Sequence, residues 1–214
     1  MAFELRTYTF IDSLQPQLAQ IIAKDNAVYD PSEYDASLIV EIAPAMEIHT
    51  MIDLALKATE VRLGSVVTER VYGMLEVHHA DQGQVRQAGT SILKATGSEE
   101  DDRTHIEILT NKIIRGVEQD HAISFTVTSS GNMVVAGESI LILEAAPAAN
   151  LLLACNQALK AAQVKLISVR PFGATGRLII SGPESEVDSA AEAAIKAISD
   201  LNAHAKAAPV KERK

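Results

Sequence analysis

Few residues in this sequence combine the types and the spacing that chemistry needs. His78 and His79 are adjacent, with Asp81 two residues later, a grouping that could suggest a metal site. Adjacent residues of a strand point to opposite faces of the sheet, so these two imidazoles are poorly placed to bind one ion. We therefore predict surface histidines at the end of a strand and expect no metal centre.

The one cysteine, Cys155, lies in the apolar run LLLACNQAL. A thiol nucleophile needs a neighbouring base, and this run supplies none, so Cys155 is predicted to be a small buried core residue. A single cysteine excludes an intramolecular disulfide, in agreement with a reducing cytoplasm. The sequence contains no Walker loop and no GxGxxG, CxxC or GxSxG motif. We expect no cofactor and no catalytic residues.

Composition and charge narrow the class of partner. The 214 residues carry a net charge of −9, which opposes long-range attraction to nucleic acid or to an anionic membrane. No run of about 18 consecutive apolar residues and no leader sequence is recognised, so a soluble cytoplasmic protein is expected. The Ala- and Lys-rich segment 205–214 is predicted to be a disordered tail.

An internal repeat is the strongest signal in the sequence. The segment that starts SLIVEIAPAMEIHT at Ser37 aligns without a gap to ILILEAAPAANLLL at Ile140, at a constant shift of 103 residues. Proline, glycine, lysine and glutamate positions recur as well as alanines, so shared composition does not explain the match. We predict two domains, residues 1–98 and 106–204, joined by the polar stretch 95–105.

Each repeat predicts the same order of elements, in the α+β class. The first has a strand at 37–42, a helix at 45–60, strands at 61–70 and 72–78, and a helix at 81–94. The second has a strand at 139–144, a helix at 147–162, strands at 164–170 and 176–181, and a helix at 183–200. A strand-like segment precedes each, with Arg6 or Arg115 at its centre. A helix is predicted at 13–22 after the first segment, whereas the second ends near the turn-like residues 129–132.

This order resembles the shell domain of bacterial microcompartments, a small antiparallel sheet flanked by helices. In that family a helix ends in Ala-Leu-Lys-Ala and a strand follows. This motif appears here as ALKATEV at 55–61 and as ALKAAQV at 158–164. The preceding strand stands where an ordinary shell domain has its last strand, which is similar to the circularly permuted tandem shell proteins. The segments ELRTYTFIDSLQPQLAQI, ERVYG and DQGQVRQAG look like the carboxysome members of that group.

The resemblance implies a structural shell protein and not an enzyme. Three chains would form a homotrimeric pseudohexamer that tiles a microcompartment facet with other shell proteins. Two trimers could stack, and a gated central pore would pass small metabolites. The rival class is a small-molecule-sensing or enzymatic α/β oligomer that binds an anion at a subunit interface; no acid–base cluster specific to one unit favours it.

The resemblance also implies roles for particular residues. Lys57 and Lys160 occupy the family's tile-edge lysine position in the two repeats. Arg6 and Arg115 fall near a second edge element, although the prolines and the histidine of that element are absent here.

The same resemblance places a pore gate at Glu69 and Arg70, in the segment TERVYG. An Arg–carboxylate pair is planar and directional, which suits a latch with two positions, although an ordinary surface ion pair is the alternative. The equivalent second-unit loop has Phe172 and Gly173, which carry no charge. We expect these two residues to line the threefold region or a chamber wall without gating.

Overall fold

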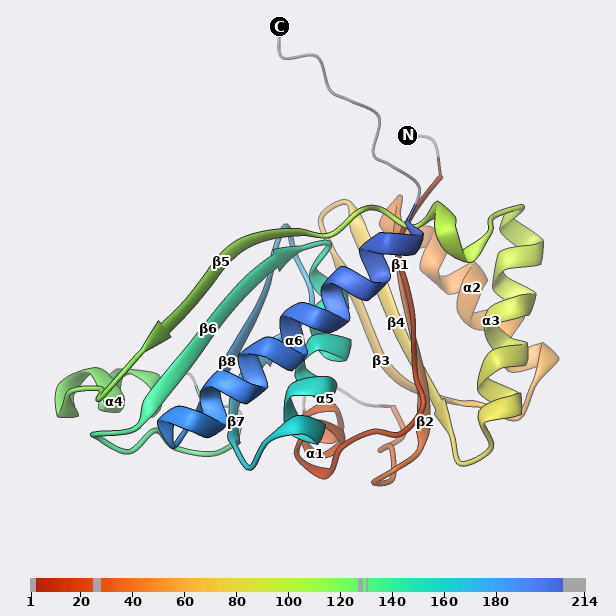
Figure 1. Ribbon diagram of the computed structural model, residues 1–214. Helices are drawn as coiled ribbons and strands as arrows, with labels where there is room; N and C mark the ends of the chain where they lie inside the picture. The colour runs from red at the N-terminus through yellow and green to blue at the C-terminus, as the bar shows by residue number, and fades with distance from the viewer. Residues whose placement is uncertain (1–2, 25–27, 127–128, 130, 206–214) are drawn as a thin grey trace, which may run out of the picture.

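The computed structural model describes residues 3–24, 28–126, 129 and 131–205. Two four-stranded antiparallel sheets are its frame (Figure 1). The first sheet has the order β1-β2-β4-β3 and the second the order β5-β6-β8-β7. Their strands are β1 Glu4–Ile11, β2 Ala36–Ala43, β3 Arg62–Glu69, β4 Tyr72–His79, β5 Glu107–Ile114, β6 Ser139–Ala146, β7 Lys165–Arg170 and β8 Gly176–Gly182. The predicted α+β class, with a small sheet flanked by helices in each unit, is confirmed.

Helices flank both sheets. Helices α2 and α3 cover the first sheet, α5 and α6 cover the second, and α1 lies against α5 and β7 (Figure 1). Short 3₁₀ turns η1 (Ala45–Glu47) and η3 (Ala148–Asn150) follow the two repeat prolines. The bounds are α1 Pro16–Lys24, α2 Ile48–Ala58, α3 Gln82–Thr96, α4 Gln119–Thr126, α5 Leu151–Ala161 and α6 Glu184–His204. The tail predicted at 205–214 lies, except for Ala205, outside the described residues.

Helix α4 was not predicted. Its residues are rich in β-branched and aromatic types, which have lower helix propensity. The helix packs through Ala122 and Phe125 on a small core cluster with Val134 and Ile140, so tertiary contacts override local preference. Its first residue, Gln119, stands 103 positions after Pro16, the start of α1, so the repeat extends upstream of the segment in which it was detected.

The register of the first strands corrects one equivalence. Each of β1 and β5 contains an irregularity in its pairing, which leaves Arg6 unpaired in β1 and Leu109 unpaired in β5. Arg6 therefore corresponds to Leu109 and not to Arg115. Arg6 lies within β1, whereas Arg115 follows the end of β5 and is not at the centre of its strand-like segment as predicted.

The predicted linker 95–105 is packed against both units. It contains the end of α3 and the 3₁₀ turn η2 (Glu100–Asp102). The buried guanidinium of Arg103 donates hydrogen bonds to the backbone carbonyls of Glu100 at 2.7 Å and Leu201 at 3.0 Å. This segment thus ties the first unit to the end of α6.

One hydrophobic core spans both units. Leu14 and Leu18 of the first unit cluster with Leu152 and Cys155 of α5 in the second. Cys155 is fully buried, and burial raises the pKa of its thiol, so its prediction as an inert core residue is confirmed. The first unit has a further core of its own, between its sheet and α2 and α3.

Close packing explains why both repeats have a glycine at the same strand position. A Cβ at Gly73 would lie 2.3 Å from the carbonyl oxygen of Ala45, and one at Gly176 would lie 2.4 Å from that of Ala148. In both units the strand passes directly beneath the 3₁₀ turn that follows the proline, and only glycine allows this approach.

We predict that Gly73→Ala and Gly176→Ala each destabilise the protein by about 2 kcal/mol, because the added methyl group forces the turn away from the sheet. The thermal midpoint, measured at fixed protein concentration, should fall by about 4–8 °C. Gly182→Ala is the control, since its nearest neighbour, Val164 Cγ1, is 3.4 Å from the new carbon. Equal midpoints for all three variants would contradict the packing argument.

Candidate functional site

The two predicted pore loops lie next to each other. Glu69 and Arg70 are at the turn between β3 and β4, and Phe172 and Gly173 are in the loop between β7 and β8. Together these loops line a hollow of about 460 Å³. A Cβ at Gly173 would be 3.4 Å from Oε2 of Glu69, so the carboxylate rests against the glycine. The chain brings all four predicted residues into one site.

Backbone conformation shapes both loops. Arg70 has φ = 55° and Gly173 has φ = 100°, both in the left-handed region. A residue with a side chain rarely adopts this conformation, so the tight turn at Arg70 holds a strained arginine at the tip of the hairpin. That turn directs Glu69 and Arg70 into solvent, where both are exposed.

The charge of the hollow is predominantly positive. Arg70, Arg170 and Arg177 line it together with one carboxylate, that of Glu69. Within the described part of the chain, Glu69 and Arg70 form no ion pair with each other or with another residue. A concave surface with excess guanidinium groups attracts small anions.

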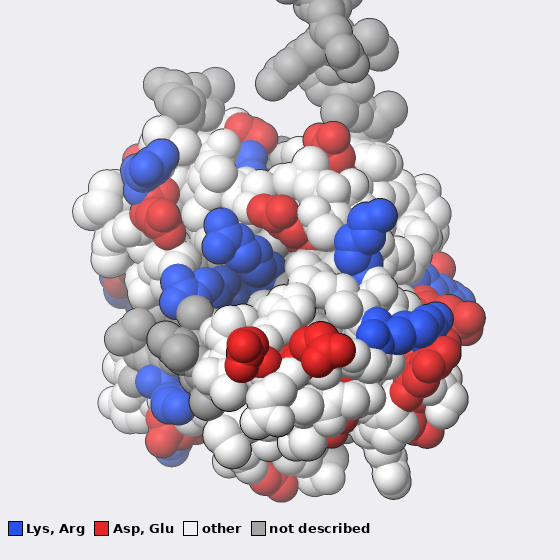
Figure 2. All heavy atoms as spheres, turned by 90° about the vertical axis from the view of Figure 1, so that its left-hand side faces the viewer, with Lys and Arg blue, Asp and Glu red and all other residues white. Residues whose placement is uncertain are grey.

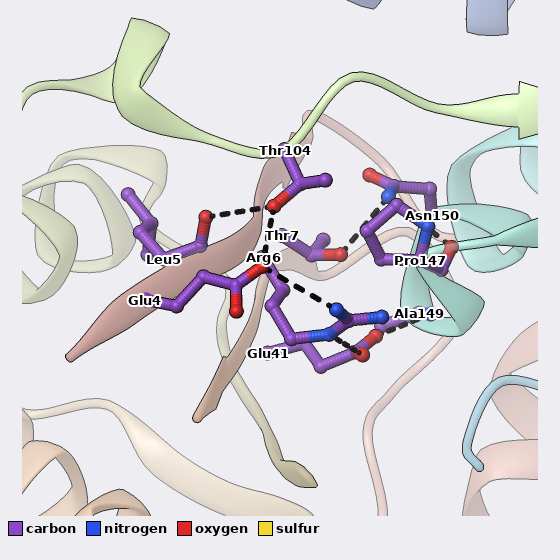
Figure 3. A network of polar contacts seen from close by, with 9 residues as sticks. All are labelled: Glu4, Leu5, Arg6, Thr7, Glu41, Thr104, Pro147, Ala149 and Asn150. Carbon is purple, nitrogen blue, oxygen red and sulfur yellow. Dashed lines mark hydrogen bonds and ion pairs between the residues drawn. The ribbon is translucent and has the colours of Figure 1, made fainter. Parts of the chain in front are cut away.

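A buried ion pair, Arg6–Glu41, lies at the contact between the two units (Figure 3). Arg6 Nε donates to Glu41 Oε1 at 2.8 Å, and Glu41 Oε2 accepts the backbone N–H of Ala149 at 2.9 Å. The Arg6 guanidinium also lies 3.7 Å from the ring centroid of Tyr72, which belongs to the pore hairpin. One carboxylate therefore links β1, the pore hairpin and the second unit.

The predicted role of Arg6 in a tile-edge contact is wrong. Its side chain is 9% exposed, and Glu41 and Tyr72 occupy the guanidinium inside the chain. The bulge in β1 turns this arginine inward, toward a carboxylate that would otherwise be buried without a counterion.

Burial dominates the electrostatics of Glu41. Removal from water raises the pKa of this carboxyl, and the Arg6 guanidinium and the Ala149 N–H oppose that shift only in part. The next residue, Asn150, bridges the same junction: its side chain accepts from Thr9 Oγ1 at 3.1 Å and donates to Thr7 Oγ1 at 2.9 Å. The contact between the units is thus built from buried polar groups that satisfy one another.

The remaining predicted edge residues lie at the surface. Lys57 pairs with Asp53 at 2.7 Å and its side chain is 74% exposed. Lys160 reaches across to Asp12 of the first unit at 2.6 Å. Arg115 is exposed and pairs with two acidic residues of α6, Glu184 and Asp188.

The histidine prediction is half wrong. His79 lies at the strand end, where its Nδ1 accepts the N–H of Asp81, but His78 is buried with its Nδ1 3.2 Å from Glu76 Oε2. Strand β4 is paired on both sides, and the face that carries His78 is covered. No group of three side chains suited to a metal occurs among the described residues.

None of the helices in the described ranges is long and apolar enough to span a bilayer.

Family comparisons define the class of protein. Residues 5–102 match the family described as the CsoS1D N-terminal domain, and residues 139–210 match the BMC domain, the shell domain predicted from the repeat. The fold is thus that of a tandem-domain microcompartment shell protein.

Individual relatives narrow this class. The chain is 44% identical to the carboxysome shell protein CsoS1D of Hydrogenovibrio crunogenus, over 92% of this chain and 97% of that one. It is 40% identical to the carboxysome shell protein CcmP of Synechococcus elongatus, over 94% and 95%. The chain belongs to this family of carboxysome shell proteins, and the predicted resemblance to the carboxysome members of the tandem shell proteins is confirmed.

Two solved structures of shell proteins have the same fold as this chain. The fused permuted hexameric shell protein MSM0275 from the RMM microcompartment has a TM-score of 0.90 and 40% identity, with coverage of 93% of this chain and 98% of that one. The double ringed trimeric shell protein MSM0271 from the same compartment has a TM-score of 0.89 and 34% identity, with coverage of 93% and 97%.

The Arg6–Glu41 pair gives a prediction about stability and pH. Arg6→Leu gives β1 the same residue type that β5 has at the equivalent unpaired position, Leu109. The substitution leaves the Glu41 carboxylate without a counterion. We expect a loss of about 3 kcal/mol at about pH 8, measured by denaturant unfolding. The loss of stability should shrink as the pH falls toward about 4.5. Burial raises the pKa of Glu41 in the folded variant, so its carboxyl becomes protonated and neutral at that pH and no longer needs a counterion.

Arg6→Leu combined with Glu41→Gln is the matched variant. A neutral amide needs no counterion and its oxygen still accepts the Ala149 N–H, so part of the stability should return. The same loss at both pH values, with no recovery in the double variant, would show that the charge of Glu41 is not the cause.

Proposed function

We propose that three copies of this chain form a ring of six units around a central pore, as a structural tile of a carboxysome shell. The observation that carries the proposal is the meeting of both pore loops in one arginine-lined hollow. The hexameric relative, at 40% identity, supports the ring, and the double ringed relative supports a stacked pair of rings as a second form.

In this proposal Glu69 and Arg70 are the gate. Three copies of the pair ring the axis, and Phe172 and Gly173 complete the wall between them. In the closed state each carboxylate binds an arginine from a neighbouring chain, and in the open state the pairs separate into solvent. The exposure of both side chains, and their lack of an ion pair within the described part of one chain, support the exchange of partners.

The chemistry of the hollow favours passage of small anionic metabolites over catalysis. The residues that line it include three arginines and a single carboxylate, and neither histidine nor cysteine is among them. Acid–base or nucleophilic catalysis requires a positioned base, and the single carboxylate of this set, Glu69, is exposed and forms no ion pair within the described part of the chain. The rival proposal of an enzymatic oligomer therefore has the weaker support, although an anion site at a subunit interface is common to both.

We further propose that the rim of the ring contacts other shell proteins in a facet. Lys57 is the stronger candidate for such an edge contact because its ammonium is exposed, whereas Lys160 already binds Asp12. A long lysine stem can lie on a neighbouring surface while its charge stays hydrated.

The gate proposal is tested by Glu69→Ala with Arg70→Ala. We expect trimers to form as in the parent and every particle to have an open pore, because the closed state loses its only ion pairs. Electron cryo-microscopy with classification of pore states is the measurement.

Lys196→Ala with Asp200→Ala is the control, since it removes an exposed ion pair of α6 far along the chain from both pore loops. This control should keep the parent's distribution of pore states. A pore in the Glu69/Arg70 variant that stays closed through other residues would rule the latch out.

A further inference from the structure

The first unit contains a buried polar cluster on the face of its sheet that α1 covers. Glu76 of β4 and Ser37 of β2 are fully buried, and His78 of β4 is 1% exposed. Ser37 Oγ donates to Glu76 Oε1 at 2.5 Å, and His78 Nδ1 lies 3.2 Å from Glu76 Oε2. Within the described part of the chain, the ion pair of Glu76 is the one with His78.

The backbone of β3 is shaped to hold this carboxylate. The pairing of β3 with β4 has an irregularity between Leu63 and Val66, opposite Glu76. Gly64 lies within it, and a Cβ at this position would overlap Oε2 of Glu76. The absence of a side chain at Gly64 therefore leaves the space that the carboxylate occupies.

The second unit shows that the fold does not require this cluster. The counterparts of Ser37, Gly64, Glu76 and His78, 103 residues later, are Ile140, Ile167, Ile179 and Ser181. The three isoleucines belong to an apolar cluster beneath α4. Well-packed apolar residues often replace a buried charged pair without loss of stability, so packing alone does not account for the polar set in the first unit.

One nitrogen of the cluster has no partner. Nε2 of His78 is buried and forms no hydrogen bond among the described residues. A neutral imidazole has one N–H and one acceptor nitrogen, and an imidazolium has two N–H groups, so Nε2 is unsatisfied in either charge state. An unsatisfied buried group destabilises the folded protein, which indicates that this histidine is not present for stability.

The carboxylate also borders a cavity behind the two pore loops. This cavity of about 30 Å³ lies between the units, and Ser65 and Glu76 line it from the first unit, Leu152 and Phe172 from the second. Its volume and its polar lining suit a water molecule. Phe172 belongs to the second pore loop, and β3, which carries Ser65, ends at Glu69 of the first. A change of charge at Glu76 therefore acts directly behind both loops.

The number of bound protons sets the net charge of the pair. With one proton, Glu76 and His78 are neutral together, as imidazolium and carboxylate or as imidazole and carboxylic acid. A second proton gives a net charge of one positive unit, and loss of the last proton gives one negative unit. Solvent screens charges at the surface, such as the Lys, Arg, Asp and Glu side chains at the second unit's end of the molecule in Figure 2. Glu76 is fully buried, so either net charge destabilises the folded state.

The other titratable groups around the pair have separate surroundings. They are Lys24 at the end of α1, Glu41 of β2, Arg62 of β3, His79 of β4, Asp12 after β1 and Cys155 of α5. Glu41 and Asp12 pair with Arg6 and Lys160, and Arg62 lies over the ring of Tyr29. Burial raises the pKa of the Cys155 thiol, which keeps it neutral, and Lys24 is exposed.

We propose that Glu76 and His78 form a proton-binding site that couples pH to the packing behind the pore loops. With one proton the pair is neutral and the cavity stays tightly packed. A second proton, or loss of the last one, places net charge beside the cavity, draws water into it and loosens the loop of Phe172. The effect on a gate rests on the proposed function, whereas the proton site lies within one chain.

The pH range follows from the proton count. In an unfolded chain glutamate releases its proton near about pH 4.3 and histidine near about pH 6.5, so between these values both states hold one proton. Below this range the unfolded chain binds one proton more than the folded pair, and above it one fewer. The stability that the pair contributes is therefore greatest within the range and falls on both sides of it.

The test compares the parent pair with a variant that carries the second unit's residues, Ser37→Ile, Gly64→Ile, Glu76→Ile and His78→Ser. Both proteins also carry Phe172→Trp, which is a unique fluorescence reporter beside the cavity because the sequence has no tryptophan. Relative to the variant, we expect the folded-to-unfolded ratio of the protein with Glu76 and His78 to fall by up to about tenfold per pH unit outside the range. Urea unfolding at fixed protein concentration measures this ratio, and the tryptophan emission of the folded protein should move to longer wavelength over the same pH values.

Glu76→Gln with His78→Asn is a second control, so the test does not depend on the folding of the isoleucine variant. It keeps hydrogen-bonding side chains at both positions but cannot titrate, and it should lose the pH response. An equal pH response in all three proteins would overturn the proton site. A stability response without a change in emission would overturn its coupling to the pore loops. Absence of trimers in native mass spectra would instead overturn the proposed ring.

Discussion

The carboxylate of Glu41 accepts hydrogen bonds from the Arg6 guanidinium and from the backbone of Ala149, and both bonds lie out of water. A buried carboxylate without such partners destabilises the folded protein. Glu41 therefore depends both on Arg6 and on the contact between the two units. Because Arg6 also stacks on Tyr72, the same constraint fixes the hairpin that carries Glu69 and Arg70. The position of the pore loop thus depends on a contact between the units.

Duplication followed by divergence explains how one fold supplies two roles. The second unit keeps Glu144 but has Leu109 in place of the arginine, and its pore loop has Phe172 and Gly173 in place of the charged pair. A ring built from such chains has threefold symmetry in its charges and near-sixfold symmetry in its backbone. Three charged loops, separated by three uncharged ones, allow a gate to change partners without rearrangement of the whole tile.

Sequence patterns predicted the fold well because its signals are periodic and repeated. The strands and the long helices follow from alternation, helical spacing and the 103-residue shift, whereas the pore loops were proposed from the resemblance to the shell family. The inward turn of Arg6, the burial of His78 and the helix α4 could not be predicted this way. Each depends on what packs against it, from a bulge in β1, from the covered face of β4 or from the cluster beneath α4.

The central claim is that the buried Arg6–Glu41 pair, at the contact between the two units, positions the hairpin that carries Glu69 and Arg70. Cryo-microscopy maps of the assembled parent and of Arg6→Leu at side-chain resolution test it most directly. We predict that the β3–β4 hairpin shifts or loses density in the variant, because Tyr72 loses the guanidinium that packs on its ring. The same hairpin position and order in both maps would contradict the account.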